Sequence, residues 1–110
     1  MLYASVNGID LYYDEHGAGD PLVLIHGFTW SGAVWNGLVP GLAVRYHVIV
    51  PDLWGHGRSS GEPATMRHQY FAADLVALLD HLGLERAHFV GHSTGGMSLV
   101  FVGTRHFDRV

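Results

Sequence analysis

The sequence predicts an α/β domain with an N-terminal hairpin, a mostly parallel sheet and helices on both faces of that sheet. Three observations lead to this fold class. Two short apolar runs flank an Asn-Gly pair near the N-terminus, later apolar runs alternate with stretches of helical periodicity, and these later runs end in loops that contain glycine. The length of 110 residues suits a single domain with one core.

The hairpin is predicted from two runs, Leu2 to Val6 and Ile9 to Glu15, that are joined by Asn7-Gly8. Asn-Gly is favoured in two-residue hairpin turns because both positions adopt a positive φ. In the second run three apolar residues alternate with three others, namely Ile9, Leu11 and Tyr13 with Asp10, Tyr12 and Asp14. We therefore expect one buried face and one wetter face, with Tyr12 on the wetter one.

The remaining elements follow in alternation. They are a strand at 22–25, two short helical pieces within 34–42 of which Pro40 begins the second, a strand at 46–50, a helix at 68–82, a strand at 87–90 and a helix at 95–106. Because Leu22 to Ile25 is continuously apolar, we expect that strand at the centre of the sheet. The helix at 68–82 has an apolar stripe, and Gly83 is placed to cap its C-terminus.

Composition excludes several classes of function. The net charge is -4, with ten acidic residues, six arginines and no lysine, so nucleic-acid binding has no electrostatic support. Cysteine is absent, and the nine histidines do not show metal-ligand spacing, so we expect neither a metal nor another cofactor. The first residues lack a signal peptide, and no apolar stretch approaches a membrane span of roughly 20 residues. We therefore expect a cytoplasmic protein without membrane partners.

The most informative motif follows the last predicted strand. Gly91-His92-Ser93-Thr94-Gly95 has the pattern Gly-x-Ser-x-Gly and leads into the last predicted helix. A serine at such a strand-to-helix turn has a strained backbone and an accessible hydroxyl. The flanking glycines, together with the additional Gly96, leave room for the strand and the helix to pass close together. The pattern predicts Ser93 as a nucleophile.

Three motifs in order, each at the end of a strand, carry a family resemblance. They are His26-Gly27-Phe28, Pro51-Asp52-Leu53-Trp54-Gly55-His56-Gly57-Arg58-Ser59, and the segment Gly91 to Gly96. In these motifs and their spacing, the chain resembles the N-terminal half of the α/β-hydrolase superfamily. The resemblance implies that residues 1–110 are the N-terminal part of one such domain, and that later strands, a cap, the triad acid and the triad histidine are absent from them.

The resemblance also assigns candidate roles. The backbone N–H groups of Phe28 and Thr94 would form the oxyanion hole, although Phe28 also suits a core aromatic position. Trp30 is a candidate for lining the substrate entrance, with packing as the alternative. His26 and His92 would have structural roles, and Asp52 would form hydrogen bonds within its own loop, between Asp52 and Ser60.

The chain has no expected base for Ser93. In this fold the order is Ser, then Asp or Glu, then His. After Ser93 the only histidine is His106 and the only acidic residue is Asp108. A helix that rises about 1.5 Å per residue would place both of them roughly 20 Å from Ser93. The strand at 87–90 would moreover lack a neighbour on its far side, and such an open edge predicts self-association.

The expected function is a serine hydrolase that acts on a small-molecule ester or related acyl substrate through an acyl-enzyme at Ser93. Two alternatives remain open. Ser93-Thr94-Gly95-Gly96 also resembles cofactor-free perhydrolases described as haloperoxidases. The chain would otherwise be a catalytically inactive fragment, or a ligand-binding module, of the same fold.

Overall fold

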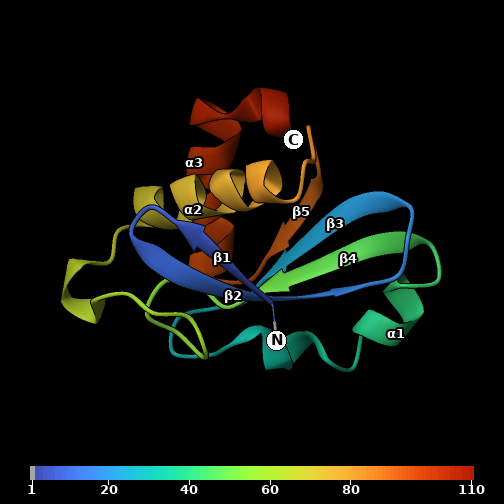
Figure 1. Ribbon diagram of the computed structural model, residues 1–110, viewed down its shortest axis with the longest axis horizontal. Helices are drawn as coiled ribbons and strands as arrows, with labels where there is room; N and C mark the ends of the chain where they lie inside the picture. The colour runs from blue at the N-terminus through green and yellow to red at the C-terminus, as the bar shows by residue number, and fades with distance from the viewer. Residues whose placement is uncertain (1) are drawn as a thin grey trace.

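A computed structural model describes residues 2–110 as a five-stranded sheet with helices on both faces (Figure 1). The strands are β1 Leu2–Val6, β2 Ile9–His16, β3 Asp20–Ile25, β4 Tyr46–Pro51 and β5 His88–Gly91. The helices are α1 Val39–Leu42, α2 His68–His81 and α3 Thr94–Arg105, with 3₁₀ turns η1 Gly32–Trp35, η2 Pro63–Thr65 and η3 Phe107–Arg109. None of the helices in the described part of the chain has both the length and the apolar character needed to cross a membrane.

The sheet is mixed, with the strand order β1-β2-β4-β3-β5. β1 pairs antiparallel with β2, and β2 pairs antiparallel with β4, whereas β3 runs parallel to both β4 and β5. The predicted α/β class is confirmed, but β4 and not β3 occupies the middle of the five strands. Because β3, β4 and β5 are parallel, their carboxyl ends lie at one edge of the sheet, and the three motif loops start there.

The hairpin forms as the Asn-Gly pair predicts, and Tyr12 departs from the expected alternation. Asn7 and Gly8 have φ values of 48° and 83°, and the two-residue turn that they form pairs Val6 with Ile9. Tyr12 is buried although it lies on the face opposite to Leu11. The guanidinium of Arg58 lies 5.1 Å from the centre of the Tyr12 ring, and this contact covers a face that the sequence pattern predicts to be wet.

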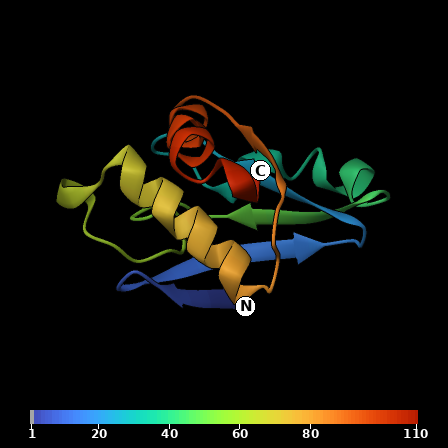
Figure 2. The ribbon, with the colours of Figure 1, turned by 90° about the horizontal axis from the view of Figure 1, so that it is seen from above.

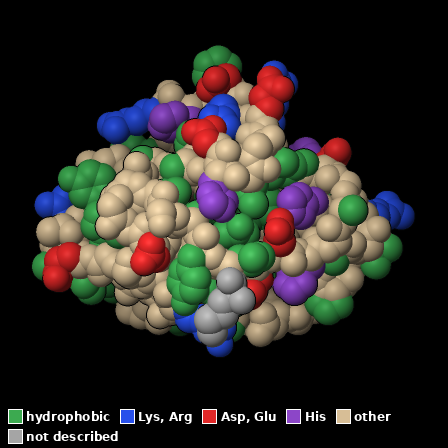
Figure 3. Space-filling model, viewed as in Figure 1, with side chains coloured by type: hydrophobic (Ala, Val, Ile, Leu, Met, Phe, Trp, Pro, Cys, Tyr) green, Lys and Arg blue, Asp and Glu red, His purple; other side chains and the backbone are tan. Residues whose placement is uncertain are grey.

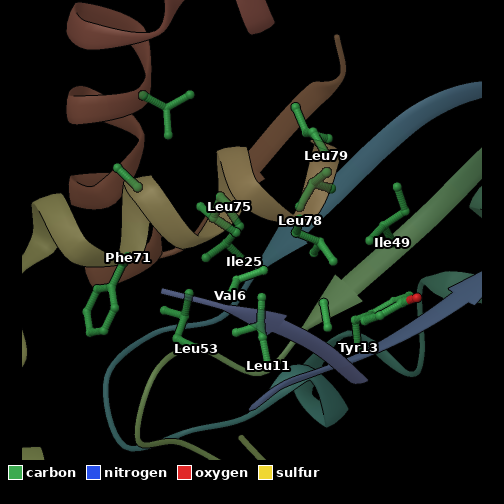
Figure 4. Close-up of a cluster of buried hydrophobic side chains, with 14 of the residues drawn as sticks. Val6, Leu11, Tyr13, Ile25, Ile49, Leu53, Phe71, Leu75, Leu78 and Leu79 are labelled. Atoms are coloured by element: carbon green, nitrogen blue, oxygen red, sulfur yellow. The ribbon is translucent and has the colours of Figure 1, made fainter. Parts of the chain in front are cut away.

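Each face of the sheet has its own apolar core. α2 and α3 cover one face, and Figure 2 shows α2 running across the strands. Figure 4 shows Leu75 and Leu78 of α2 among Leu11, Ile25 and other strand residues. η1 and α1 cover the other face, where Leu24 packs in a smaller cluster. Ile25 and Leu24 therefore serve different cores, because successive side chains of a strand point to opposite faces.

The remaining expected elements are confirmed within one or two residues at most ends. α2 ends at His81, with Gly83 at φ 70° beyond it, and α3 starts at Thr94. Pro40 lies in the first turn of α1, where its missing N–H is not needed by the helix. Figure 3 shows acidic, basic and histidine side chains interspersed on the face that it presents.

The outer edge of β5 is partly covered by the end of the chain. Within residues 2–110, β5 pairs with β3 alone. The N–H of Ala87 donates to the carbonyl of Arg109 at 3.0 Å, and the Arg109 guanidinium donates to the Asp80 carboxylate at 2.6 Å. These contacts hold η3 against the start of β5, whereas Val90 further along remains half exposed. Self-association through this edge stays a prediction.

One carboxyl group is buried in the core beneath the hairpin. Asp74 of α2 is 1% exposed, and its Oδ1 accepts a hydrogen bond from Asn7 Nδ2 at 2.9 Å. Its Oδ2 has no partner within the described residues. Burial raises the pKa of Asp74 from 3.8 to about 6, while the bond from Asn7 opposes this rise. The charged form of Asp74 is therefore destabilised at neutral pH.

We predict that Asp74→Asn stabilises the protein at pH 7.5 by on the order of 1–2 kcal/mol, because the amide keeps an acceptor for Asn7 without carrying a buried charge. The folded-state pKa lies above the unfolded one, so the carboxyl contributes stability at low pH that is lost as pH rises to about 6. The gain from Asp74→Asn should therefore shrink towards zero at pH 4. Urea unfolding at both pH values measures it.

Asp108→Asn is the matched control, because it removes one exposed acidic charge. It should change the free energy of unfolding by less than about 0.5 kcal/mol. An Asp74→Asn gain of equal size at pH 4 and pH 7.5 would contradict the buried-charge explanation.

Candidate active site

Ser93 lies on a sharp turn between β5 and α3. Its backbone has φ 55° and ψ -116°, a conformation that residues with a side chain rarely adopt. Ser93 is exposed, and its hydroxyl has no hydrogen-bond partner within residues 2–110. The hydroxyl also lies at the N-terminus of the 12-residue helix α3, where the helix dipole favours negative charge. The strain is maintained by the elements that cross at this point.

Two of the flanking glycines are required by close backbone contacts. A Cβ on Gly91 would lie 2.6 Å from the carbonyl carbon of Gly95, and a Cβ on Gly95 would lie 2.5 Å from the carbonyl oxygen of Ile25. Gly96 differs from the expectation. A Cβ there would be 3.4 Å from the Gly91 oxygen, an ordinary van der Waals distance, because Gly96 faces away from the tightest point of the crossing.

His26 fixes the loop that follows β3. Its ring is completely buried, and Nε2 accepts a hydrogen bond from the Leu53 N–H at 2.9 Å. Nδ1 therefore carries the hydrogen and donates to the carbonyl of Gly27 at 2.6 Å. Burial lowers the pKa of His26, although the bond to Gly27 opposes this effect. A neutral imidazole thus connects the loops after β3 and β4.

Asp52 provides a second connection between the same loops. Its Oδ2 accepts from the Arg58 N–H at 2.9 Å, within the loop where the sequence predicts such bonds. Its Oδ1 accepts from the Gly32 N–H at 2.7 Å, a contact outside that loop that no motif in the sequence indicates. A Cβ at Gly57 would overlap the Asp52 carboxylate, so glycine is needed there as well.

The segment that carries Phe28 and Trp30 passes directly beside the elbow. A Cβ on Gly27 would lie 3.3 Å from His92 Nδ1 and 3.5 Å from Ser93 Cβ. The ring of Trp30 stacks on that of His92, with centroids 5.4 Å apart and planes at 9°. Trp30 and His92 thus hold each other in place, while Ser93 stays accessible.

Two hollows adjoin these residues. Phe28 and Thr94 line the first, of about 150 Å³, together with Met66, Arg67, His68 and Phe71. Trp30 and His92 line the second, of about 170 Å³, together with Val34, Trp35 and Leu38. Larger hollows lie elsewhere, including one of about 330 Å³ around Arg58, but the elbow residues do not line them.

The structure brings the candidate residues together as follows. Phe28 and Thr94 share one hollow, Trp30 lines the other, and Ser93 joins the helix that begins with Thr94. Arg67 and His68 also line the first hollow, and no sequence motif predicts this. They lie at the start of α2, and the packing of that helix places them there. His106 lies beyond the far end of α3, so it is separated from Ser93 by the length of that helix.

Comparisons with known proteins agree with the fold. A family model described as alpha/beta hydrolase fold matches residues 20–110. A soluble epoxide hydrolase of Corynebacterium sp. strain C12 is 38% identical over 93 residues, which is 84% of this chain and 32% of that protein. A non-heme haloperoxidase of Rhodococcus erythropolis is 39% identical over 103 residues, which is 91% of this chain and 37% of that protein.

A solved structure extends the agreement to three dimensions. The enol-lactonase from Burkholderia xenovorans LB400 is 31% identical and superposes with a TM-score of 0.94. The match covers 99% of this chain and 44% of the enol-lactonase chain. The chain spans about a third of the length of the curated relatives that it matches. Because the family model matches residues 20–110, the chain belongs to the alpha/beta hydrolase fold family.

Proposed function

We propose that Ser93 is the nucleophile of a serine hydrolase that cleaves carboxylic esters or related acyl bonds through an acyl-enzyme. The observation that carries the proposal is the exposed Ser93 hydroxyl on a strained turn, at φ 55°, at the start of α3. Strain of this kind persists only where surrounding contacts maintain it, and it is concentrated at functional sites. The similarity to an enol-lactonase supports an acyl substrate, since a lactone is a cyclic ester.

The proposed reaction has two steps. The Ser93 oxygen attacks the carbonyl carbon of the substrate, its proton passes to a base, and the alcohol departs with a proton. Water then attacks the resulting ester of Ser93 and releases the acid. In both steps the negative charge on the carbonyl oxygen would be stabilised by the N–H groups of Phe28 and Thr94 and by the dipole of α3.

The base is not supplied beside Ser93 by the described residues. The Ser93 hydroxyl has no hydrogen bond to any histidine within residues 2–110. Since the curated relatives are about three times as long as the region that this chain matches, full turnover is proposed for the whole protein. Residues 2–110 would contribute the nucleophile and the oxyanion-binding amides.

The similarity to an epoxide hydrolase supports the fold more than the reaction. Epoxide opening by covalent catalysis in this superfamily uses an aspartate and forms an alkyl ester. A serine hydroxyl would instead form an ether, which water does not readily cleave. Ser93 therefore favours acyl transfer over epoxide opening.

A second candidate is a perhydrolase, favoured by the segment Ser93 to Gly96 and by the haloperoxidase relative. In this reaction hydrogen peroxide would replace water in the second step. It would attack the Ser93 ester and release a peracid, with Ser93 regaining its proton. Peracid then oxidises bromide to hypobromous acid and returns to the carboxylic acid. Both candidates share the first step, so they differ only in the acceptor of the acyl group.

A fluorophosphonate probe tests the shared first step. We expect one phosphonyl group per chain, attached at Ser93, and at least a hundredfold slower labelling of Ser93→Ala, because the reacting oxygen is removed. Mass spectrometry of the digested protein locates the label. Ser5→Ala is the control, as it removes another exposed hydroxyl. If the whole protein is folded and takes no label at Ser93, a ligand-binding or inactive module of this fold would be favoured.

Bromination of monochlorodimedone tests the second candidate. With acetate, hydrogen peroxide and bromide, a perhydrolase should brominate this β-diketone in a reaction that depends on Ser93. The absorbance loss should be at least tenfold slower with Ser93→Ala. Ester hydrolysis that depends on Ser93 without such bromination would leave water as the acyl acceptor.

Asp52→Ala should slow acylation of Ser93 by tenfold or more and lower the free energy of unfolding by about 2–3 kcal/mol. The substitution leaves the N–H groups of Gly32 and Arg58 without their acceptor and frees the segment that carries Phe28. Release of nitrophenol from 4-nitrophenyl acetate reports acylation, and urea titration reports stability. Acylation at the wild-type rate in folded Asp52→Ala would argue against this positioning role, and Asp108→Asn controls for the charge.

A further inference from the structure

The hollow shared by Phe28 and Thr94 contains a cationic side chain and no acidic one. Its other lining residues are Met66, Arg67, His68 and Phe71. The chain as a whole has a net charge of -4 and only six cationic residues. An arginine beside the candidate acyl site is therefore a local feature rather than a consequence of a basic surface.

Arg67 has donors available for a ligand. Its Nη1 donates to the carbonyl of Met66 at 2.8 Å. Within residues 2–110 it forms no ion pair, in contrast to Arg109, which pairs with Asp80. A guanidinium carries five N–H donors in a planar fork that matches the two oxygens of a carboxylate. Arg67 can therefore bind an anion without giving up a salt bridge.

His68 lies next to Arg67 in a fixed orientation. Its ring stacks on that of Phe101, with centroids 6.5 Å apart and planes at 7°, and meets the ring of Phe71 edge-on at 6.1 Å. The ring nitrogens form no hydrogen bond to the described residues. α2 begins at His68 with no acidic residue in its first turn and no side-chain cap from Arg67, so the start of this helix adds to the positive potential.

Building on the proposed acyl chemistry at Ser93, we propose that this hollow binds a carboxylate at the far end of the acyl group. The substrates would then be esters or lactones of dicarboxylic acids. With the scissile carbonyl at the amides of Phe28 and Thr94, the distal carboxylate would reach Arg67 and His68. Phe71 and Met66 offer apolar surface to the methylene groups that separate the scissile carbonyl from the distal carboxylate.

The size of the hollow limits the acyl group. A volume of about 150 Å³ is small beside the roughly 300–1,000 Å³ of pockets that enclose drug-sized ligands. A carboxylate with two methylene groups contains five heavy atoms. The proposal therefore concerns short dicarboxylic acids, of the length of succinate or glutarate, rather than long-chain ones.

A matched pair of esters tests the selectivity. Mono-4-nitrophenyl glutarate and 4-nitrophenyl valerate have the same leaving group and acyl chains of similar length, but only the first has a distal carboxylate. We expect the glutarate ester to acylate Ser93 faster, and Arg67→Gln to reduce the ratio of the two rate constants by tenfold or more. Arg86→Gln removes an exposed charge elsewhere and should leave the ratio unchanged. A ratio that Arg67→Gln does not change would overturn the proposal.

A binding measurement separates this proposal from the proposed function. Glutarate titrated into the ¹⁵N-labelled full chain should shift the amide signals of Arg67, His68 and Thr94, and glutaramide, which is neutral, should bind at least tenfold more weakly. Arg67→Gln should weaken glutarate binding by a similar factor. Equal binding of the two compounds would overturn the carboxylate subsite. Selective glutarate binding with no acylation of Ser93 by either ester would support the subsite and reject the hydrolase.

Discussion

The close crossing of α3 over the end of β3 is the constraint on which the site depends. The chain leaves β5, reverses at Ser93 and enters α3 with Gly95 against the carbonyl of Ile25. No side chain fits at Gly91 or Gly95 in this arrangement, and Ser93 has to adopt φ 55° to complete the turn. The strain is sustained because strand pairing and the core beneath α2 and α3 fix both ends of the turn.

The same crossing determines what surrounds the serine. Since β3, β4 and β5 are parallel, their three loops emerge at one edge of the sheet. His26 and Asp52 then tie the first loop to the second, through hydrogen bonds from the N–H groups of Leu53 and Gly32. Both connections use buried groups with full hydrogen bonding, which is expensive to disrupt in a medium of low polarity. The segment carrying Phe28 is therefore held beside Ser93 rather than left as a free loop.

Local patterns were sufficient for much of this arrangement. Asn7-Gly8 predicted the hairpin turn, Gly83 the end of α2, and Gly-x-Ser-x-Gly the elbow, because each depends on backbone angles that few residue types adopt. Patterns failed where a distant residue changed the environment. Tyr12 is buried where Tyr3 of the neighbouring strand and Arg58, far along the chain, both contact its ring. Alternation within one strand carries no information about such contacts.

The sequence by itself thus determined the α/β class, the order of its elements and Ser93 as the candidate nucleophile, because periodicity, turn chemistry and motif spacing are local properties. Only the tertiary structure decided that β4 lies in the middle of the sheet, that Asp52 reaches Gly32, and that Arg67 and His68 line one hollow with Phe28 and Thr94. These features arise when segments far apart in the chain pack together, and no spacing within the sequence encodes them.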